Sequence, residues 1–181
     1  LFGEAGDDIL NGDAGDDTLS GGADNNTYRF VGNFGLDTII SATGYDIVDL
    51  SNFTTGLTTT ISTQLLIEDG SGSSISASGT EIELLKTGSA ADAFNFAGGG
   101  RMHGSFDAGT GEDRLDFSLY QSPVIVSLTA LGTLEGWAGL ADVLGGFDNI
   151  EDIIGGAGSD TLVGLDAAAT WDLTTETDHR Y

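Results

Sequence analysis

The sequence of 181 residues contains no cysteine, and only five lysine and arginine residues stand against 29 aspartate and glutamate residues. Without cysteine the chain has no disulfide framework. The formal net charge of −24 excludes a basic surface for nucleic acid and argues against charge-driven binding to anionic membranes. No stretch is apolar enough to cross a bilayer as a helix. We therefore expect an acidic protein with no nucleic-acid partner and no transmembrane segment.

Signs of catalysis are also missing. The two histidines, His103 and His179, are far apart in the sequence, and neither lies near a nucleophile motif. No H-E-x-x-H, G-x-S-x-G or phosphate-loop motif occurs. The many carboxylates form no defined pair of the kind that a polysaccharide-cleaving site would need. We therefore expect no enzyme within these residues.

Glycine, in contrast, is abundant, and near the N-terminus it recurs in a nine-residue unit of the form G-G-x-G-x-D-x-U-x, where U is a large apolar residue. Three units follow one another without a gap, and a fourth follows after Phe30 and Val31. The four units span residues 3–11, 12–20, 21–29 and 32–40. Repetition in tandem makes this pattern the strongest signal in the sequence.

The spacing within this unit favours a calcium site in the turn. Glycine permits positive φ angles, so the backbone can turn sharply and direct carbonyl oxygens inward. The aspartate at the sixth position adds a charged oxygen, and calcium takes about six to eight oxygen ligands in irregular geometry. The predicted calcium ligands in the four units are Gly3, Ala5, Asp7, Asp8, Gly12, Ala14, Asp16, Asp17, Gly21, Ala23, Asn25, Asn26, Gly32, Phe34 and Asp37. Calcium is the one cofactor that we predict.

Two nine-residue units complete one coil, so we expect each unit to stack on the next but one. This stacking places Asp8 and Asn26 on one edge, and Asp17 and Asp37 on the other. Each unit buries one sizeable apolar side chain, which stabilises by about 1.5–3 kcal/mol, whereas ordering nine residues costs about 9–18 kcal/mol of backbone entropy. We therefore expect the first coils to be disordered without calcium and to fold with it. Because Asn26 replaces the aspartate and Asp24 a glycine, the third unit should bind most weakly.

A second, longer repeat with a spacing of 67–68 residues begins after residue 40. The alignment pairs residues 43–51, 57–63 and 81–85 with residues 110–118, 124–130 and 149–153. At 57–63 and 124–130, apolar residues alternate with mostly polar ones, which predicts half-buried strands. Residues 133–144 could form a short helix, although their glycines argue against it.

The long unit retains turns of the calcium type at Asp113 and Asp160, where we predict ions if a neighbouring coil supplies further ligands. The turns at Asp46 and Asp92 have lost glycines, since Ala90 stands where one is expected. A purely structural turn and a metal site remain equally open at these two positions, and Asp46 is kept among the candidate ligands.

Many short strands between glycine-rich turns predict an all-β fold, a parallel β-roll or β-helix solenoid with calcium in the turns. We expect a nonapeptide β-roll over residues 1–50 and, continuous with it, a β-solenoid of the long repeat over residues 51–181. Each coil would contact neighbouring repeats of the same chain. Because the chain begins in mid-repeat without methionine or a signal peptide, we expect it to be a fragment of a longer protein.

Two stretches, Gly12–Gly22 and Gly155–Val163, resemble almost letter for letter the nonapeptides of the RTX (repeats-in-toxin) calcium-binding proteins. The resemblance implies a β-roll that is unfolded in the calcium-poor cytosol and folds after export, commonly by type I secretion. The later residues, with phrases such as Asp116-Phe117-Ser118, are similar to repetitive regions of large bacterial surface proteins and adhesins. Millimolar calcium is an extracellular condition, so we expect a secreted protein, with attachment to the cell surface as one form of it.

Three functional hypotheses follow. The chain is a calcium-responsive stalk or passenger of a secreted surface protein, which the repeated long unit favours. Alternatively, it is a module that binds a glycan or a cell surface, with Trp137, Trp171 and Tyr120 as candidates for stacking on a sugar. As a third alternative, it is the folding and secretion tail of an exported enzyme such as a lipase or protease.

Overall fold

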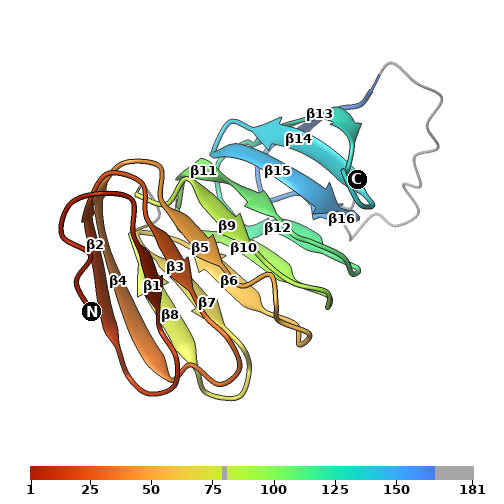
Figure 1. Cartoon of the computed structure of the whole chain (residues 1–181). Coiled ribbons are helices and arrows are strands. Elements are labelled where there is room, and N and C mark those ends of the chain that lie inside the picture. Colours follow the sequence, from red (N-terminus) through yellow and green to blue (C-terminus); the bar gives the residue numbers. More distant parts are fainter. Residues whose placement is uncertain (79–80, 166–181) are drawn as a thin grey trace.

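The computed structural model describes residues 1–78 and 81–165, which form two β-sheets that lie face to face (Figure 1). Strands are the only regular elements in this part of the chain. The nine-stranded sheet has the spatial order β1 (Ile9–Asn11), β3 (Thr27–Arg29), β5 (Ile47–Asp49), β9 (Leu84–Lys86), β11 (Met102–Asp107), β15 (Leu144–Ile150), β14 (Trp137–Ala141), β13 (Ile125–Leu131) and β17 (Thr161–Val163). The eight-stranded sheet has the order β16 (Asp152–Ile154), β12 (Arg114–Leu119), β10 (Ala93–Ala97), β6 (Thr58–Ile61), β7 (Leu65–Glu68), β8 (Ser74–Ala77), β4 (Leu36–Thr43) and β2 (Thr18–Ala23). The described chain is all-β, as predicted.

The nonapeptide units form coils in which successive strands alternate between the two sheets. Ile9 of β1 pairs with Thr27 of β3, and Thr18 of β2 pairs with Thr38 of β4, both in parallel. Each unit therefore lies on the next but one, which is the stacking that the repeat length predicts. The second spacing is longer by two residues because the chain passes through Phe30 and Val31.

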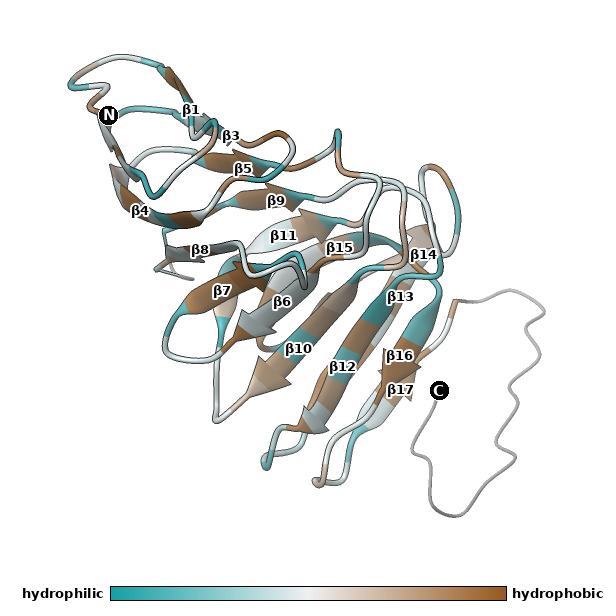
Figure 2. Cartoon of the chain, turned by 90° about the horizontal axis from the view of Figure 1, so that it is seen from below, coloured by the Kyte–Doolittle hydropathy of each residue, from teal (hydrophilic) through white to brown (hydrophobic). Residues whose placement is uncertain are grey.

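The hydrophobic core lies between the sheets, and it grows from the N-terminal end onward. Residues 1–26 bury only Leu10 and Leu19 among their apolar side chains. The next stretch, residues 27–53, buries Tyr28, Phe30, Phe34, Ile39, Val48, Leu50 and Phe53. Apolar stretches run along strands such as β5, β7 and β9 (Figure 2). The predicted lack of an apolar interior therefore applies to the first 26 residues and not to the coils that follow.

Aromatic rings join the two sheets in the middle of the molecule. Phe94 of β10 stacks on Phe106 of β11, with ring centroids 4.4 Å apart. Phe96 of β10 also contacts Phe106 across the sheets, with ring centroids 6.2 Å apart. Fully burying each such ring contributes about 1.5–3 kcal/mol, so this part of the chain has a core of the usual kind.

The solenoid is not wholly parallel, and this corrects the predicted architecture. The pairings β6–β7, β7–β8, β13–β14 and β14–β15 are antiparallel, so each sheet contains one three-stranded meander. The turn after β7 shows why the chain reverses. Asp69 Oδ1 accepts hydrogen bonds from the N–H groups of Ser71 (2.8 Å) and Ser73 (3.2 Å), and Gly70 between them has φ of 73°. Such a tight Asp-Gly turn returns the chain antiparallel to β7 instead of carrying it across to the other sheet.

The second meander occupies the segment for which a helix was considered. Residues 137–141 form β14, and β14 pairs antiparallel with β13 on one side and with β15 on the other. The glycines of this segment permit close approach of neighbouring backbones: a Cβ atom on Gly139 would lie 2.5 Å from the carbonyl oxygen of Ser127. A strand is therefore favoured over a helix here.

The two copies of the long repeat lie in opposite sheets. The aligned strands β5 and β12 belong to the nine-stranded and the eight-stranded sheet, respectively, and the two meanders follow the opposite assignment. Between β5 and β12 the chain crosses between sheets at β5–β6, β8–β9, β9–β10, β10–β11 and β11–β12, which is five crossings. An odd number of crossings exchanges the two sheets between consecutive copies.

Both sheets run without a break past residue 50, because β5 pairs with β9 and β4 pairs with β8. The division of the chain into units 1–50 and 51–181 stays a prediction. The candidate sugar-stacking residue Trp171 and the histidine His179 lie outside the described residues.

Candidate calcium-binding turns

The glycine-rich turns use backbone conformations that side chains disfavour. Gly6 and Gly15, at the fourth position of the first two units, have φ of 112° and 114°. At the second position, Glu4 and Asp13 also have positive φ, of 75° and 41°, where the repeat pattern has glycine. The third unit repeats this, with φ of 90° at Gly22 and 71° at Asp24. In the first three units the pattern therefore marks the two left-handed positions of the turn, and departures from glycine there are strained.

Replacing Glu4 by glycine is expected to stabilise the protein. A left-handed conformation costs a non-glycine residue roughly 1–2 kcal/mol, so Glu4→Gly should raise the free energy of unfolding by about 1 kcal/mol in saturating calcium. Urea unfolding measures the change. Glu4→Ala removes the same charge but keeps the Cβ atom, so a gain of equal size in both variants would contradict a backbone origin.

On one edge of the solenoid, reciprocal hydrogen bonds join the first and third units. The N–H of Asn25 donates to Asp7 Oδ1 at 3.0 Å, and the N–H of Asp8 donates to Asn26 Oδ1 at 3.3 Å. The N–H of Asn26 in turn donates to Asp46 Oδ1 at 2.8 Å. At the fifth position the first unit therefore accepts a hydrogen bond from the third unit, and at the sixth position it donates one to the third unit.

The other edge repeats this arrangement between the second and fourth units. The N–H of Leu36 donates to Asp16 Oδ1 at 2.9 Å, and the N–H of Asp17 donates to Asp37 Oδ1 at 2.8 Å. The structure therefore brings Asp8 next to Asn26 and Asp17 next to Asp37.

Each edge leaves one buried carboxylate oxygen without a hydrogen bond. Asp8 Oδ2 and Asp37 Oδ2 are both buried and lack a partner. Asp8 Oδ2 and the carbonyl oxygen of Gly21 lie 2.5 and 2.7 Å from the place that a Cβ atom on Gly3 would take. The turn therefore gathers hard oxygen ligands where any larger residue would clash, and these residues fit a calcium ion.

Main-chain oxygens would have to complete the coordination of such an ion. Among residues 1–78 and 81–165, no three His, Cys, Asp or Glu side chains are grouped closely enough to hold a metal. That backbone carbonyls in the glycine turns act as ligands stays a prediction. The ring of the predicted ligand Phe34 lies in the core, 5.8 Å from Phe30 and 5.5 Å from Phe53 between centroids, so only its carbonyl group is available.

The other predicted ligands of the first and third positions lie along the same turns. Ala5 and Ala23 form a parallel bridge between stacked units. A Cβ atom on Gly12 would overlap the ring of Phe30, at 2.3 Å, and one on Gly21 would lie 2.6 Å from the side chain of Asn26. Ala14 and Gly32 are exposed. These positions can contribute backbone oxygens only.

The later predicted ligands fall into two groups. Asp46 and Asp160 have both carboxylate oxygens in hydrogen bonds: Asp46 accepts from the N–H of Asn26 and from Ser41 Oγ, and Asp160 accepts from Val124 at 2.9 Å and Gly156 at 2.6 Å. Asp113 differs, because it is fully buried and its Oδ2 has no partner. Asp92, the turn left open in the sequence analysis, is also buried and also has an Oδ2 without a partner. The structure thus separates the satisfied carboxylates of Asp46 and Asp160 from those of Asp92 and Asp113, which resemble Asp8 and Asp37.

Two glutamates that the sequence analysis did not select complete the long-repeat turns. Glu83 Oε2 accepts a hydrogen bond from the N–H of Asp46 at 2.8 Å, and Glu151 Oε2 accepts one from the N–H of Asp113 at 2.7 Å. They take the place of the sixth-position aspartate on the stacked turn. The alignment of residues 81–85 with 149–153 already pairs Glu83 with Glu151, and this was the available signal.

Burial dominates the electrostatics of these turns. Burial raises the pKa of Asp37 to about 6, and the neighbouring carboxylates of Asp17 and Asp16 act in the same direction. Burial likewise raises the pKa of Asp113 to about 7, with further contributions from three nearby acids. The two ion pairs of the described chain, Arg29–Asp49 at 3.3 Å and Arg114–Asp116 at 3.7 Å, do not involve these turn carboxylates.

Stacked glycine turns with buried, unpartnered carboxylate oxygens are features expected of a calcium-binding repeat protein. The RTX calcium-binding nonapeptide repeat matches the chain in four copies, over residues 1–28 and 145–168. The chain therefore carries RTX calcium-binding repeats, as its resemblance predicted, and calcium is the ion that such repeats bind. No curated protein and no solved structure matches it. Proteins with these repeats are typically secreted. The described residues include no helix long and apolar enough to cross a membrane.

Proposed function

We propose that this chain is a calcium-responsive structural segment of a secreted bacterial surface protein, a stalk or passenger with no catalytic activity of its own. In this proposal the segment folds fully when it meets calcium outside the cell. The observation that carries the proposal is the pair of buried, unpartnered carboxylate oxygens of Asp8 and Asp37 at stacked glycine turns.

The side chains of Asp8 and Asp37, together with backbone carbonyls of the same turns, would hold the ions. A bound divalent cation supplies the positive charge that these carboxylates lack within the chain. Without it, each turn retains a desolvated carboxylate beside other acids, which opposes folding. The small core of residues 1–26 provides little to offset that cost.

The glycan-binding alternative receives little support from the described residues. Tyr120 is 3 % exposed and packs on Phe117, and Trp137 is partly buried against the core. The ring of Tyr120 is therefore not accessible for stacking on a sugar, and that of Trp137 is accessible only in part. The third alternative, a secretion tail, depends on the flanking sequence, which would show whether a catalytic domain precedes this segment.

Thermal unfolding of the full chain, followed by circular dichroism, tests the proposal. Each site with a dissociation constant near 10⁻⁴ M should contribute about 2.7 kcal/mol in about 10 mM calcium. For a chain of this size, two such sites should raise the unfolding midpoint by roughly 10–20 °C relative to a chelated sample. Magnesium should substitute poorly because it requires smaller, octahedral sites. Equal midpoints in calcium, magnesium and chelator would refute the proposal.

A further inference from the structure

Two segments of the chain match the acceptor motif for N-linked sugars, Asn-x-Ser/Thr with x other than proline. They are Asn25-Asn26-Thr27 and Asn52-Phe53-Thr54. A motif of three residues arises easily by chance, so it indicates a modification site only where the fold exposes it. The structure places the two motifs in opposite settings.

The first motif is built into the stacked turns and strands. Asn25 Oδ1 accepts a hydrogen bond from the N–H of Tyr45 at 2.8 Å, and Asn26 is only 1 % exposed. The N–H of Thr27, the first residue of β3, donates to the carbonyl oxygen of Asp8 at 2.8 Å. A transferase has to bind the backbone of its acceptor motif, and here that backbone is already bonded to a neighbouring coil. The folded chain therefore withholds Asn25 from such an enzyme.

The second motif lies on an exposed turn between β5 and β6. The N–H of Phe53 donates to the carbonyl oxygen of Leu50 at 2.9 Å, which closes a β-turn with Asn52 at its third position. Phe53 is buried, and its ring lies 5.5 Å from that of Phe34 between centroids. Asn52 and Thr54 are exposed on either side of it, and within the described residues neither side chain forms a hydrogen bond. The Asn52 carboxamide is therefore free to react.

The turn itself does not need Asn52, as the second copy of the long repeat shows. In the aligned turn, the N–H of Tyr120 donates to the carbonyl oxygen of Phe117 at 2.7 Å. Leu119 takes the exposed place of Asn52, and residues 119–121 contain neither asparagine nor threonine. The same turn thus forms without the motif, so the motif of the first copy is available for a role other than folding.

An open cleft of about 320 Å³ beside Asn52 offers room for the first sugar. Its lining includes the polar side chains of Asn33, Thr55, Asp69 and Ser71, which come from three segments of the chain. Such side chains can exchange hydrogen bonds with the hydroxyl groups of a sugar. A sugar on Asn52 would therefore lie over a polar surface and not over an apolar one.

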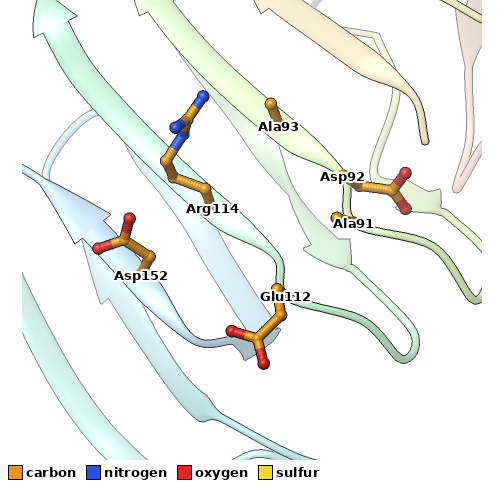
Figure 3. Close-up of a pocket in the computed structure, with 6 residues that line it drawn as sticks. All are labelled: Ala91, Asp92, Ala93, Glu112, Arg114 and Asp152. Carbon is orange, nitrogen blue, oxygen red and sulfur yellow. The ribbon is translucent and has the colours of Figure 1, made fainter.

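The cleft beside Arg114 has a different character. Charged side chains line it, namely Asp92, Glu112, Arg114 and Asp152 (Figure 3). No acceptor motif lies in the segments that form it. The Asn52 turn thus combines an acceptor motif with an adjoining polar cleft, and the Arg114 cleft does not.

We propose that Asn52 is an acceptor for N-linked glycosylation and that the fold excludes Asn25 from it. A separate asparagine glycosyltransferase would supply a sugar activated as a phosphate ester, linked to a nucleotide or to a lipid. Asn52 Nδ2 attacks the anomeric carbon, and the bond from that carbon to the phosphate oxygen breaks. The phosphate group leaves with the electron pair, and Nδ2 loses one proton to a base of the transferase. This modification goes beyond the proposed function and needs no bound calcium.

Tryptic peptide mass spectrometry of the full chain, purified from the cells that produce it and from their medium, tests this proposal. Trypsin cleaves after Arg29 and Lys86, so the two motifs fall in separate peptides, 1–29 and 30–86. Peptide 30–86 should carry sugar on Asn52, and peptide 1–29 should carry none. A nucleotide-linked donor adds single sugars and a lipid-linked donor adds a preassembled chain, so the added mass distinguishes the two donors.

Variants of the motif separate asparagine-linked sugar from other modifications. Asn52→Gln and Thr54→Ala should each abolish the added mass, whereas Thr54→Ser, which keeps the hydroxyl group, should retain it. Transfer of the motif to the exposed turn of the second copy, by Leu119→Asn with Gln121→Thr, should add sugar to peptide 115–180.

Peptide 30–86 without sugar, or sugar on peptide 1–29, would overturn the inference. Added mass that survives Asn52→Gln would place the sugar on a hydroxyl group and overturn it as well, and an unmodified peptide 115–180 in the transfer variant would contradict the role of the turn. Neither Asp8 nor Asp37 lines the cleft, so Asn52→Gln should leave the calcium-induced shift of the unfolding midpoint unchanged. The glycosylation site and the proposed function can therefore fail separately.

Discussion

Chelation of calcium from the folded protein is expected to release residues 1–26 before the aromatic centre of the solenoid. These residues bury only two apolar side chains, Leu10 and Leu19, and they contain the unpartnered Asp8 Oδ2. Calcium at about 100 times its dissociation constant stabilises a site by about 2.7 kcal/mol, so its removal should speed amide exchange in β1 and β2 by about 100-fold.

Hydrogen–deuterium exchange in calcium and in excess chelator makes this measurement on the full chain. Strands β9, β10 and β11 should keep their protection, because Phe94 and Phe106 stack between the sheets there without help from an ion. Uniform loss of protection along the chain would mean that the solenoid unfolds as one unit. Unchanged exchange in residues 1–26 would show that the first coils do not depend on calcium.

The stacking of the nonapeptides could be predicted from sequence because local chemistry determines it. The repeat places its turns at fixed intervals, and two units per coil then bring Asp8 to Asn26 and Asp17 to Asp37. The prediction that the nonapeptide units lack an apolar core was wrong for the units after residue 26, because it counted only one buried apolar side chain in each unit. Phe30 and Phe34, at the junction of the third and fourth units, both enter the core.

The antiparallel meanders and the glutamates of the long unit could not be predicted in the same way. Alternation at residues 57–63 identifies a strand but not its partner, because pairing depends on long-range register. The Asp69-Gly70 turn was the local sign that the chain reverses after β7. Glu83 and Glu151 reach their turns only after a meander of variable length, so no fixed spacing marks them. Their equivalence is visible only once the two long copies are aligned.

Replacing Asp37 by asparagine is expected to stabilise the calcium-free protein and to weaken its response to calcium. Without calcium the pKa of Asp37 is about 6 in the folded chain, against an ordinary value of 3.8. The folded state therefore holds a proton between these values that the unfolded state releases, so stability falls as pH rises from about 4 through about 6. The shift corresponds to roughly 2–3 kcal/mol lost by pH 7.5. Asp37→Asn should recover most of that energy, because its Oδ1 can still accept from the N–H of Asp17.

Urea unfolding at pH 5 and pH 7.5, each with chelator and with calcium, tests this prediction. The variant should show a flatter pH dependence in chelator and a smaller gain in calcium, since a neutral amide oxygen binds calcium less well than a carboxylate. Asp13→Asn removes one charge from an exposed turn position without a side-chain hydrogen bond, and it should change neither quantity by more than about 0.5 kcal/mol. If Asp37→Asn lost stability in chelator yet kept the full calcium gain, Asp37 would be a structural residue of the turn and the ion would bind elsewhere. The two variants together therefore separate a ligand carboxylate from a merely acidic surface, which is the distinction on which the role of the first coils depends.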